Sequence, residues 1–267
     1  MKTVFQELAD GVFRRRYESL DLNVGVVIAE DGVLVVDTRA SHAEADELKT
    51  ELGWLTSLPV RWVVDTHWHW DHVFGNSRFP ESRIWGHRLC RQAMLERGDS
   101  MKDDAAAWLP DRRADFDEVV ITAPEAVFTD TAVIDLGSRS VTLRYHGPAH
   151  TDADIVVSVD GTGVGFFGDM LEQGSPPVFD DAFPVHWPGA LRDALSVAGP
   201  VIVPGHGDVM DLSSAREQLD EIRLVAEIAS RCAAGDLSIE EAVTLGPYPE
   251  EFMAPALRRA LELGPAI

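Results

Sequence analysis

The chain has 267 residues, of which 45% are apolar and 25% are charged, as in folded globular proteins and unlike disordered ones. Its 23 basic and 45 acidic residues give a formal net charge of -22. Such a charge repels both the phosphates of nucleic acids and an anionic membrane surface. We therefore expect neither a nucleic acid nor a membrane as partner, and the composition leaves the oligomeric state open.

The N-terminal sequence and the cysteines bear on location. Residues 1–20 lack the apolar core of a secretory signal, and the most apolar stretch, residues 22–36, is interrupted by two acidic residues. Cys90 and Cys232 are interpreted as buried, reduced thiols rather than as a disulfide. These features predict a cytoplasmic protein.

The first 65 residues predict strands around one helix. Short runs rich in β-branched residues predict strands at 12–18, 23–30, 33–37 and 60–65. An Asp-Gly dipeptide between the second and third runs indicates a hairpin turn. Ser41 and Glu44 have the spacing of a capping box, which predicts a helix that ends before Pro59.

The second half repeats this order of strands followed by helices. Strands are expected at 132–136, 141–146, 154–159, 164–167 and 201–203. Helices are expected from a capping box at Ser214 to about residue 234, from a second capping box at Ser238, and over 250–263. This order predicts an α+β fold in which two β-sheets pack face to face with helices outside.

Two stretches fit neither a strand nor a helix pattern. Residues 97–118 are charged and interrupted by Trp and Pro, and residues 172–189 are rich in Pro. Long irregular segments inside a compact domain are often lids or pocket walls. Surface decoration is the alternative for each stretch.

The segment with the clearest chemistry follows the strand at 60–65. It places four potential metal ligands within six residues: His67, His69, Asp71 and His72. Alternate residues of an extended segment point the same way, so His67 and His69 can share one ion. Asp71 and His72 begin a helical turn and diverge from that pair, which suits a second ion.

Three further candidate metal ligands lie at the ends of other predicted apolar strands. His150, Asp169 and His206 each follow a predicted strand, and glycines flank His206 closely enough to allow close backbone approach. One edge of a sheet assembly can therefore gather all seven side chains.

In these motifs the chain resembles the metallo-β-lactamase superfamily. The resemblance implies a single domain over residues 1–267: a four-layer αββα sandwich of two mixed sheets flanked by helices, with C-terminal helices at about 213–267. It also implies that His67, His69 and His150 bind a first metal ion. Asp71, His72 and His206 would bind a second ion, and Asp169 would bridge the two. Nitrogen and oxygen ligands favour zinc as the two divalent ions, with iron or manganese as alternatives.

The activity implied is that of a dinuclear metal-dependent hydrolase, in which a hydroxide shared by the two ions attacks the substrate. Asp71, or a water on the second metal, is the candidate that protonates the leaving group. Asp65 can accept the second N–H of a ligand histidine, or it is an ordinary residue at a strand end.

At some motif positions this chain differs from individual branches of the superfamily, and these differences narrow the range of expected substrates. True zinc β-lactamases carry Cys or Ser at the position of Asp169, and flavodiiron oxidoreductases carry Glu at that of His69. Glyoxalase II keeps both residues but holds glutathione with basic groups, which Arg258 and Arg259 match only weakly. We expect a small ester, thioester or lactone that is neutral or apolar. The alternatives are a mononuclear iron persulfide dioxygenase, a class B β-lactamase-like activity and a non-catalytic binding module.

Several aromatic side chains stand beside the ligands or in residues 172–189. Each is either a packing residue or a substrate contact, and the candidates for substrate binding are Trp68, Trp70, Phe179, Phe183 and Trp187. His186 is a further candidate, with a structural role as its alternative.

Overall fold

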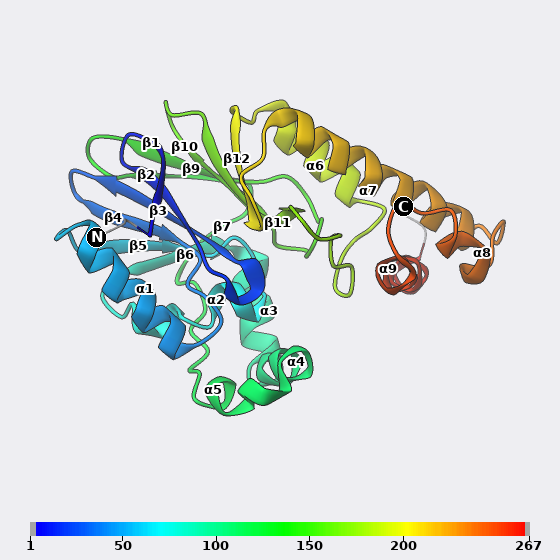
Figure 1. The fold of residues 1–267 in the computed structure, drawn as a ribbon, viewed down its shortest axis with the longest axis horizontal. Coiled ribbons are helices and arrows are strands. Elements are labelled where there is room, and N and C mark those ends of the chain that lie inside the picture. The colour runs from blue at the N-terminus through cyan, green and yellow to red at the C-terminus, as the bar shows by residue number, and fades with distance from the viewer. Residues whose placement is uncertain (1–3, 265–267) are drawn as a thin grey trace.

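The structure, a computed structural model, describes residues 4–264. Its strands are β1 (Gln6–Ala9), β2 (Val12–Arg16), β3 (Asn23–Ala29), β4 (Gly32–Val36), β5 (Val60–Val64), β6 (Arg83–His87), β7 (Ala126–Phe128), β8 (Thr131–Asp135), β9 (Ser140–Tyr145), β10 (Ile155–Val159), β11 (Val164–Glu172) and β12 (Val201–His206). They form two sheets, one drawn mainly in blue and cyan and the other mainly in green and yellow in Figure 1.

Both sheets are mixed. Within the described residues, the first runs β1-β2-β3-β4-β5-β6-β7, antiparallel as far as β4 and parallel from β4 to β7. The second runs β12-β11-β10-β9-β8, with β11 and β12 parallel and the other pairs antiparallel. Parallel neighbours end at the same edge, so β4 and β5 deliver their C-terminal residues to one place, as do β11 and β12.

Helices cover the outer faces. The α-helices are α1 (His42–Leu55), α2 (Trp70–Val73), α3 (Arg88–Arg97), α4 (Ser100–Trp108), α5 (Arg113–Asp117), α6 (Trp187–Ser196), α7 (Leu212–Ala233), α8 (Ile239–Val243) and α9 (Glu250–Leu263), with short 3-10 turns η1 (Ser19–Asp21), η2 (Asn76–Arg78) and η3 (Pro110–Arg112). Helix α1 covers the first sheet, α6 and α7 lie along the second, and α8 and α9 extend beyond it (Figure 1).

The apolar core is divided in the way that four layers require. Val27, Leu34 and Val64 of the first sheet pack with Val157 and Phe166 of the second. A separate cluster joins the outer face of the first sheet to α1, and another joins the second sheet to α6, α7 and α9. The predicted α+β sandwich with the order αββα is thus confirmed.

Residues 97–118 were expected to be irregular, and this was wrong: they form α4, η3 and α5. Helix α4 buries only Met101 and Ala105, one turn apart. Such a short apolar stripe gives too little periodicity to predict a helix. Of the irregular stretch expected at 172–189, residues 173–186 contain no helix or strand, but Glu172 ends β11 and residues 187–189 begin α6, so the expectation was wrong at both ends.

Two local predictions can be compared directly. The capping box at Ser238 is present, with both of its hydrogen bonds. The one expected at Ser214 is not the start of α7, because Asp211 caps that helix by accepting from the Ser214 backbone N–H at 2.9 Å. No helix of the described residues is long and apolar enough to cross a membrane.

Candidate metal centre

The histidine-rich motif occupies the turn between β5 and α2. His67 and His69 lie in the extended segment, while Asp71 and His72 lie in α2. His67 and His72 are fully buried, and Asp71 is 8% exposed. Although the His67 and His72 rings lie 4.3 Å apart, the two pairs of side chains belong to different groups of candidate ligands, as the sequence predicted.

The remaining three candidates come from the second sheet. Asp169 lies within β11, which continues to Glu172 instead of ending before Asp169 as expected, and His206 is the last residue of β12. His150 lies in the turn between β9 and β10. A β-bridge between Leu22 and His206 ties the edge of the second sheet to the segment that leads into β3.

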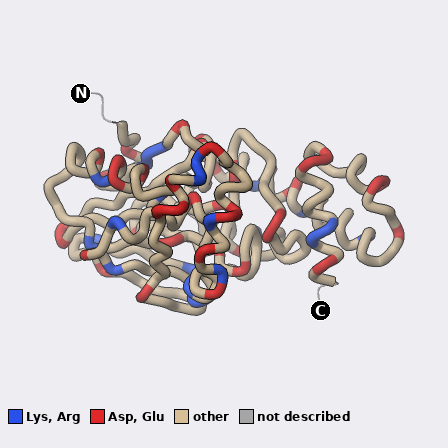
Figure 2. Tube along the Cα trace, turned by 90° about the horizontal axis from the view of Figure 1, so that it is seen from below, with Lys and Arg blue, Asp and Glu red and all other residues tan. Residues whose placement is uncertain are grey.

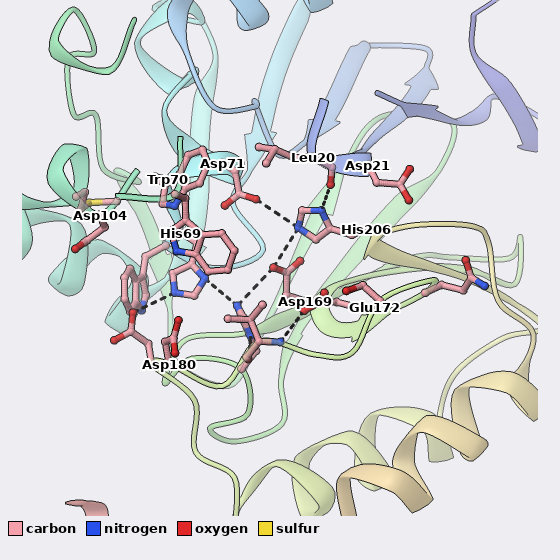
Figure 3. Close-up of a pocket in the computed structure, with 18 of the residues that line it drawn as sticks. Leu20, Asp21, His69, Trp70, Asp71, Asp104, Asp169, Glu172, Asp180 and His206 are labelled. Carbon is pink, nitrogen blue, oxygen red and sulfur yellow. Dashed lines mark hydrogen bonds and ion pairs between the residues drawn. The ribbon is translucent and has the colours of Figure 1, made fainter. Parts of the chain in front are cut away.

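The seven side chains form two groups with separations suited to metal binding. One group contains His67, His69, His150 and Asp169, and the other contains Asp71, His72 and His206; within each, one donor atom per residue lies within 4.8 Å of the others. Figure 3 shows His69, Asp169 and His206 turned toward one another, with Asp71 beside His206.

Asp169 lies between the two groups. Its Oδ2 is 3.6 Å from His67 Nε2 and 3.5 Å from His150 Nε2, and its Oδ1 is 3.2 Å from His72 Nε2. Its Oδ2 is also 3.4 Å from His206 Nε2. A Cβ at Gly205 would collide with this carboxylate, so the glycine is needed there. One carboxylate thus faces imidazoles of both groups.

Every one of the five imidazoles has a partner on the side away from the centre. These partners are Thr66 Oγ1 for His67 at 3.0 Å, Asp181 Oδ2 for His69 at 3.5 Å, Asp37 Oδ2 for His72 at 2.8 Å, the Val178 carbonyl for His150 at 3.1 Å and the Leu20 carbonyl for His206 at 2.7 Å. Such partners fix the tautomer and the ring orientation of a metal ligand.

The sequence did not indicate Asp37 as part of the site. Its backbone has a left-handed φ of 66°, and its carboxylate accepts hydrogen bonds from the Thr66 N–H and hydroxyl in addition to His72. Asp65, which was considered as the partner of a ligand histidine, accepts from Asn76 Nδ2 at 2.8 Å instead. The parallel pairing of β4 and β5 places Asp37 in the position that was considered for Asp65.

The donor set fits divalent cations. His67 Nε2 and Asp169 Oδ1 are two of the seven buried side-chain atoms of the described residues that have no hydrogen-bond partner. Buried polar atoms are normally satisfied, so two orphans that face the same small space indicate a missing partner of positive charge. Imidazole nitrogens and carboxylate oxygens without thiolate match zinc, and also iron or manganese.

The pKa values reflect the buried charges. Burial, and then the neighbouring His72, lower the pKa of His67 well below its ordinary value. Burial and His69 lower the pKa of His150 to about 3. For His72 and His206 burial acts in the same direction, but Asp169 and Asp71 outweigh it and hold both pKa values well above the ordinary one. The carboxylates therefore stabilise positive charge in the second group, where a cation would replace the protons.

A cavity of about 300 Å³ opens onto the two groups. The residues that line it are Leu20, Asp21, Trp68, His69, Trp70, Asp71, Met101, Asp104, Trp108, His150, Asp169, Glu172, Gln173, Gly174, Ser175, Val178, Asp180, Asp181 and His206. No lysine or arginine is among the described residues on this wall. Residues 97–118 and 172–189 both contribute to it, so their prediction as pocket walls is confirmed.

Of the aromatic candidates, Trp68 and Trp70 line the cavity, and the structure adds Trp108, which the sequence did not single out. The other candidates are not on the wall. Phe179 and Trp187, the first residue of α6, are buried in the core cluster that joins the second sheet to α6, α7 and α9, with ring centroids 5.2 Å apart. Phe183 lies under the Arg259 guanidinium, and His186 is an exposed residue at the start of α6. The positions of Phe179, Phe183 and Trp187 correspond to packing, the alternative role considered for them. His186 follows neither expectation, because its side chain is exposed and makes no cap hydrogen bond at the start of α6.

The fold and the site define an αββα sandwich with a cluster of histidines and aspartates at its edge that could bind metal ions. Residues 20–229 match the Metallo-beta-lactamase superfamily, and the chain belongs to this family. Its members are in general metal-dependent hydrolases or related enzymes.

Solved structures support the fold. A metallo-β-lactamase from Hirschia baltica has 19% identity and a TM-score of 0.64, over 82% of this chain and 96% of its own. The sec-alkylsulfatase Pisa1 from Pseudomonas sp., described as stereoselective and inverting, has 12% identity and a TM-score of 0.77, over 98% of this chain and 50% of its own.

A curated relative is 2,4-dinitroanisole O-demethylase subunit beta from Nocardioides sp. (strain JS1661). It is 25% identical over 214 residues, which are 79% of this chain. The chain spans 61% of the length of that relative.

Proposed function

We propose that the protein is a dinuclear metal-dependent hydrolase that acts on a small uncharged ester, thioester or lactone. The observation that carries this proposal is the convergence of two ligand groups, joined by Asp169, on a cavity whose described wall residues include no lysine or arginine. The Asp71, His72 and His206 group favours two ions over the single ion of a persulfide dioxygenase. We further propose zinc as the metal and a small molecule as the only partner needed.

The cavity wall supports an uncharged substrate. Asp21, Asp104, Asp180 and Asp181 line the cavity in addition to the proposed ligands, and acidic residues predominate over the whole chain (Figure 2). An anionic substrate would meet this field without a lysine or arginine among the described wall residues to hold it. Trp68, Trp70 and Trp108 offer aromatic surface to an apolar group.

Each residue of the site has a proposed role. His67, His69 and His150 would hold one ion and Asp71, His72 and His206 the other, with Asp169 shared. The bound ions would supply Lewis acidity and a nucleophilic hydroxide near neutral pH. Asp71 lines the cavity, with its Oδ2 3.4 Å from His206 Nε2, and we propose that it passes a proton to the leaving group. Trp68 and Trp108 would bind the apolar part of the substrate.

Paired substrates test the proposal. Zinc-loaded protein is assayed with an uncharged aryl acetate and with the matching aryl half-ester of succinate, which adds one negative charge. We expect a higher kcat/KM for the acetate and no turnover by His67→Ala. An aryl methyl ether is included because the name of the curated relative describes O-demethylation of an anisole. A preference for the succinate, or no hydrolysis of any ester, thioester or lactone, would contradict the proposal.

A further inference from the structure

His69 faces the centre differently from the other four imidazoles. Its Nδ1 lies 2.8 Å from His150 Nε2, whereas His67, His72, His150 and His206 direct Nε2 toward Asp169. An imidazole that binds a cation through Nδ1 must carry its proton on Nε2. The outward Nε2 of His69 therefore requires an acceptor.

That acceptor comes from the segment that joins β11 to α6. Asp181 Oδ2 is 3.5 Å from His69 Nε2, a distance within the range of ion pairs. The same segment supplies the Val178 carbonyl to His150 Nδ1 at 3.1 Å. Two of the three histidines of the first group are thus held from outside by residues 178–181.

The segment is itself anchored to the second sheet and to α7. Glu172 Oε1 accepts from the Val178 N–H at 3.3 Å. Gln218 of α7 accepts from the Glu172 N–H at 3.0 Å and donates to its carbonyl at 2.6 Å. Val178 therefore has a fixed position, and Asp181 follows three residues later on the same cavity wall.

We propose that Asp181 is a positioning residue, which holds the His69 ring in the tautomer and orientation that leave Nδ1 free to bind the first metal ion. The wall that contacts the substrate then also determines the affinity for that ion. This inference rests on the metal centre and not on the identity of the substrate. Outer carboxylates of this kind contribute about 10-fold to 100-fold to metal affinity.

The neighbouring Asp180 provides a matched control. Both residues line the cavity, and replacing either one with alanine removes one negative charge from the same wall. Asp180 has no hydrogen bond or ion pair to a proposed ligand within the described residues. Chelator competition with zinc measures the affinity for each ion in the wild type, Asp181→Ala, Asp180→Ala and Asp181→Asn.

In Asp181→Ala we expect one of the two ions to bind about 10-fold to 100-fold more weakly, with the other ion and the urea midpoint of the metal-free protein unchanged. Asp180→Ala should bind zinc like the wild type, and Asp181→Asn should recover part of the lost affinity, because its amide oxygen still accepts from His69 Nε2.

Equal losses of zinc affinity in both alanine variants would assign the effect to cavity charge and overturn the proposal. Wild-type affinity in Asp181→Ala would also overturn it. If the wild type binds no zinc, the metal centre itself is wrong; if it binds zinc but hydrolyses nothing, only the proposed function fails.

Discussion

Replacing Asp37 by Asn tests whether a residue outside the ligand set controls the second metal site. The carboxylate is 2% exposed and accepts three hydrogen bonds, from Thr66 N at 2.8 Å, Thr66 Oγ1 at 2.9 Å and His72 Nδ1 at 2.8 Å. Asn tolerates the left-handed φ of 66° at this position, so the backbone conformation is kept.

The substitution replaces one carboxylate oxygen of Asp37, which accepts hydrogen bonds, with an amide NH2 group, which donates them. The amide oxygen can still accept from Thr66 N, and the Thr66 hydroxyl can rotate to accept from the amide nitrogen. The amide nitrogen cannot accept from His72 Nδ1, which drives the His72 proton toward Nε2, the atom that faces Asp169. A protonated Nε2 is unable to bind a metal ion.

The expected magnitudes follow from these bonds. Loss of an outer partner weakens metal binding by about 10-fold to 100-fold, or about 1.4 to 2.8 kcal/mol. Loss of one hydrogen bond to a charged group costs about 1.5 to 3 kcal/mol in the free energy of unfolding of the metal-free protein. Zinc affinities are measured by chelator competition and stability by urea unfolding.

Asp65→Asn is the matched control, because Asp65 is equally buried but bonds to Asn76 and to no proposed ligand. We expect it to alter stability without a selective loss of one ion. If Asp37→Asn binds two ions with wild-type affinity, His72 does not depend on Asp37 for metal binding.

Three further substitutions probe the bridge, the core and a buried acid. Asp169→Ala should weaken both ions together, because its carboxylate faces histidines of both groups; loss of one ion alone, by elemental analysis, would argue against a bridge. Trp187→Ala should lower the free energy of unfolding by about 3 to 5 kcal/mol, because Trp187 is fully buried and donates to the Met170 carbonyl. The kcat/KM of the folded variant should stay near the wild-type value. A selective rise in KM would show that Trp187 contacts the substrate. Burial raises the pKa of Asp154 from 3.8 to about 8, so the folded state favours its protonated form. The stability from this group is full below pH 4 and is lost as the pH rises through 8. Urea unfolding of the metal-free protein should therefore show a smaller fall between pH 4 and pH 8 in Asp154→Asn, and identical slopes would contradict the burial effect.

That the seven candidate ligands lie close together could be predicted from the sequence, because each of them is at or near the end of an apolar strand. His67 and His69 alternate in an extended segment, and a helical turn begins beside Asp71. These two features separate the candidate ligands of the first group from Asp71 and His72 of the second. A run of β-branched residues is a local signal, and it identified nine of the twelve strands that the structure describes.

The residues that orient the ligands could not be found in this way. Asp37 meets His72 only because β4 lies parallel to β5, and Asp181 meets His69 only because residues 173–186 fold back over the cavity. Such contacts depend on tertiary structure and leave no period in the sequence. The same reason explains why Phe179 and Trp187 could not be told apart from wall residues.

Two divalent ions are expected to bind at the edge of the sandwich. Elemental analysis of protein that has been loaded with zinc and then freed of excess metal counts these ions. We expect about two zinc ions per chain, and about one in a variant with His72→Ala and His206→Ala combined. A ratio near zero in the wild type would rule out the metal centre, and a ratio near one would rule out a dinuclear centre.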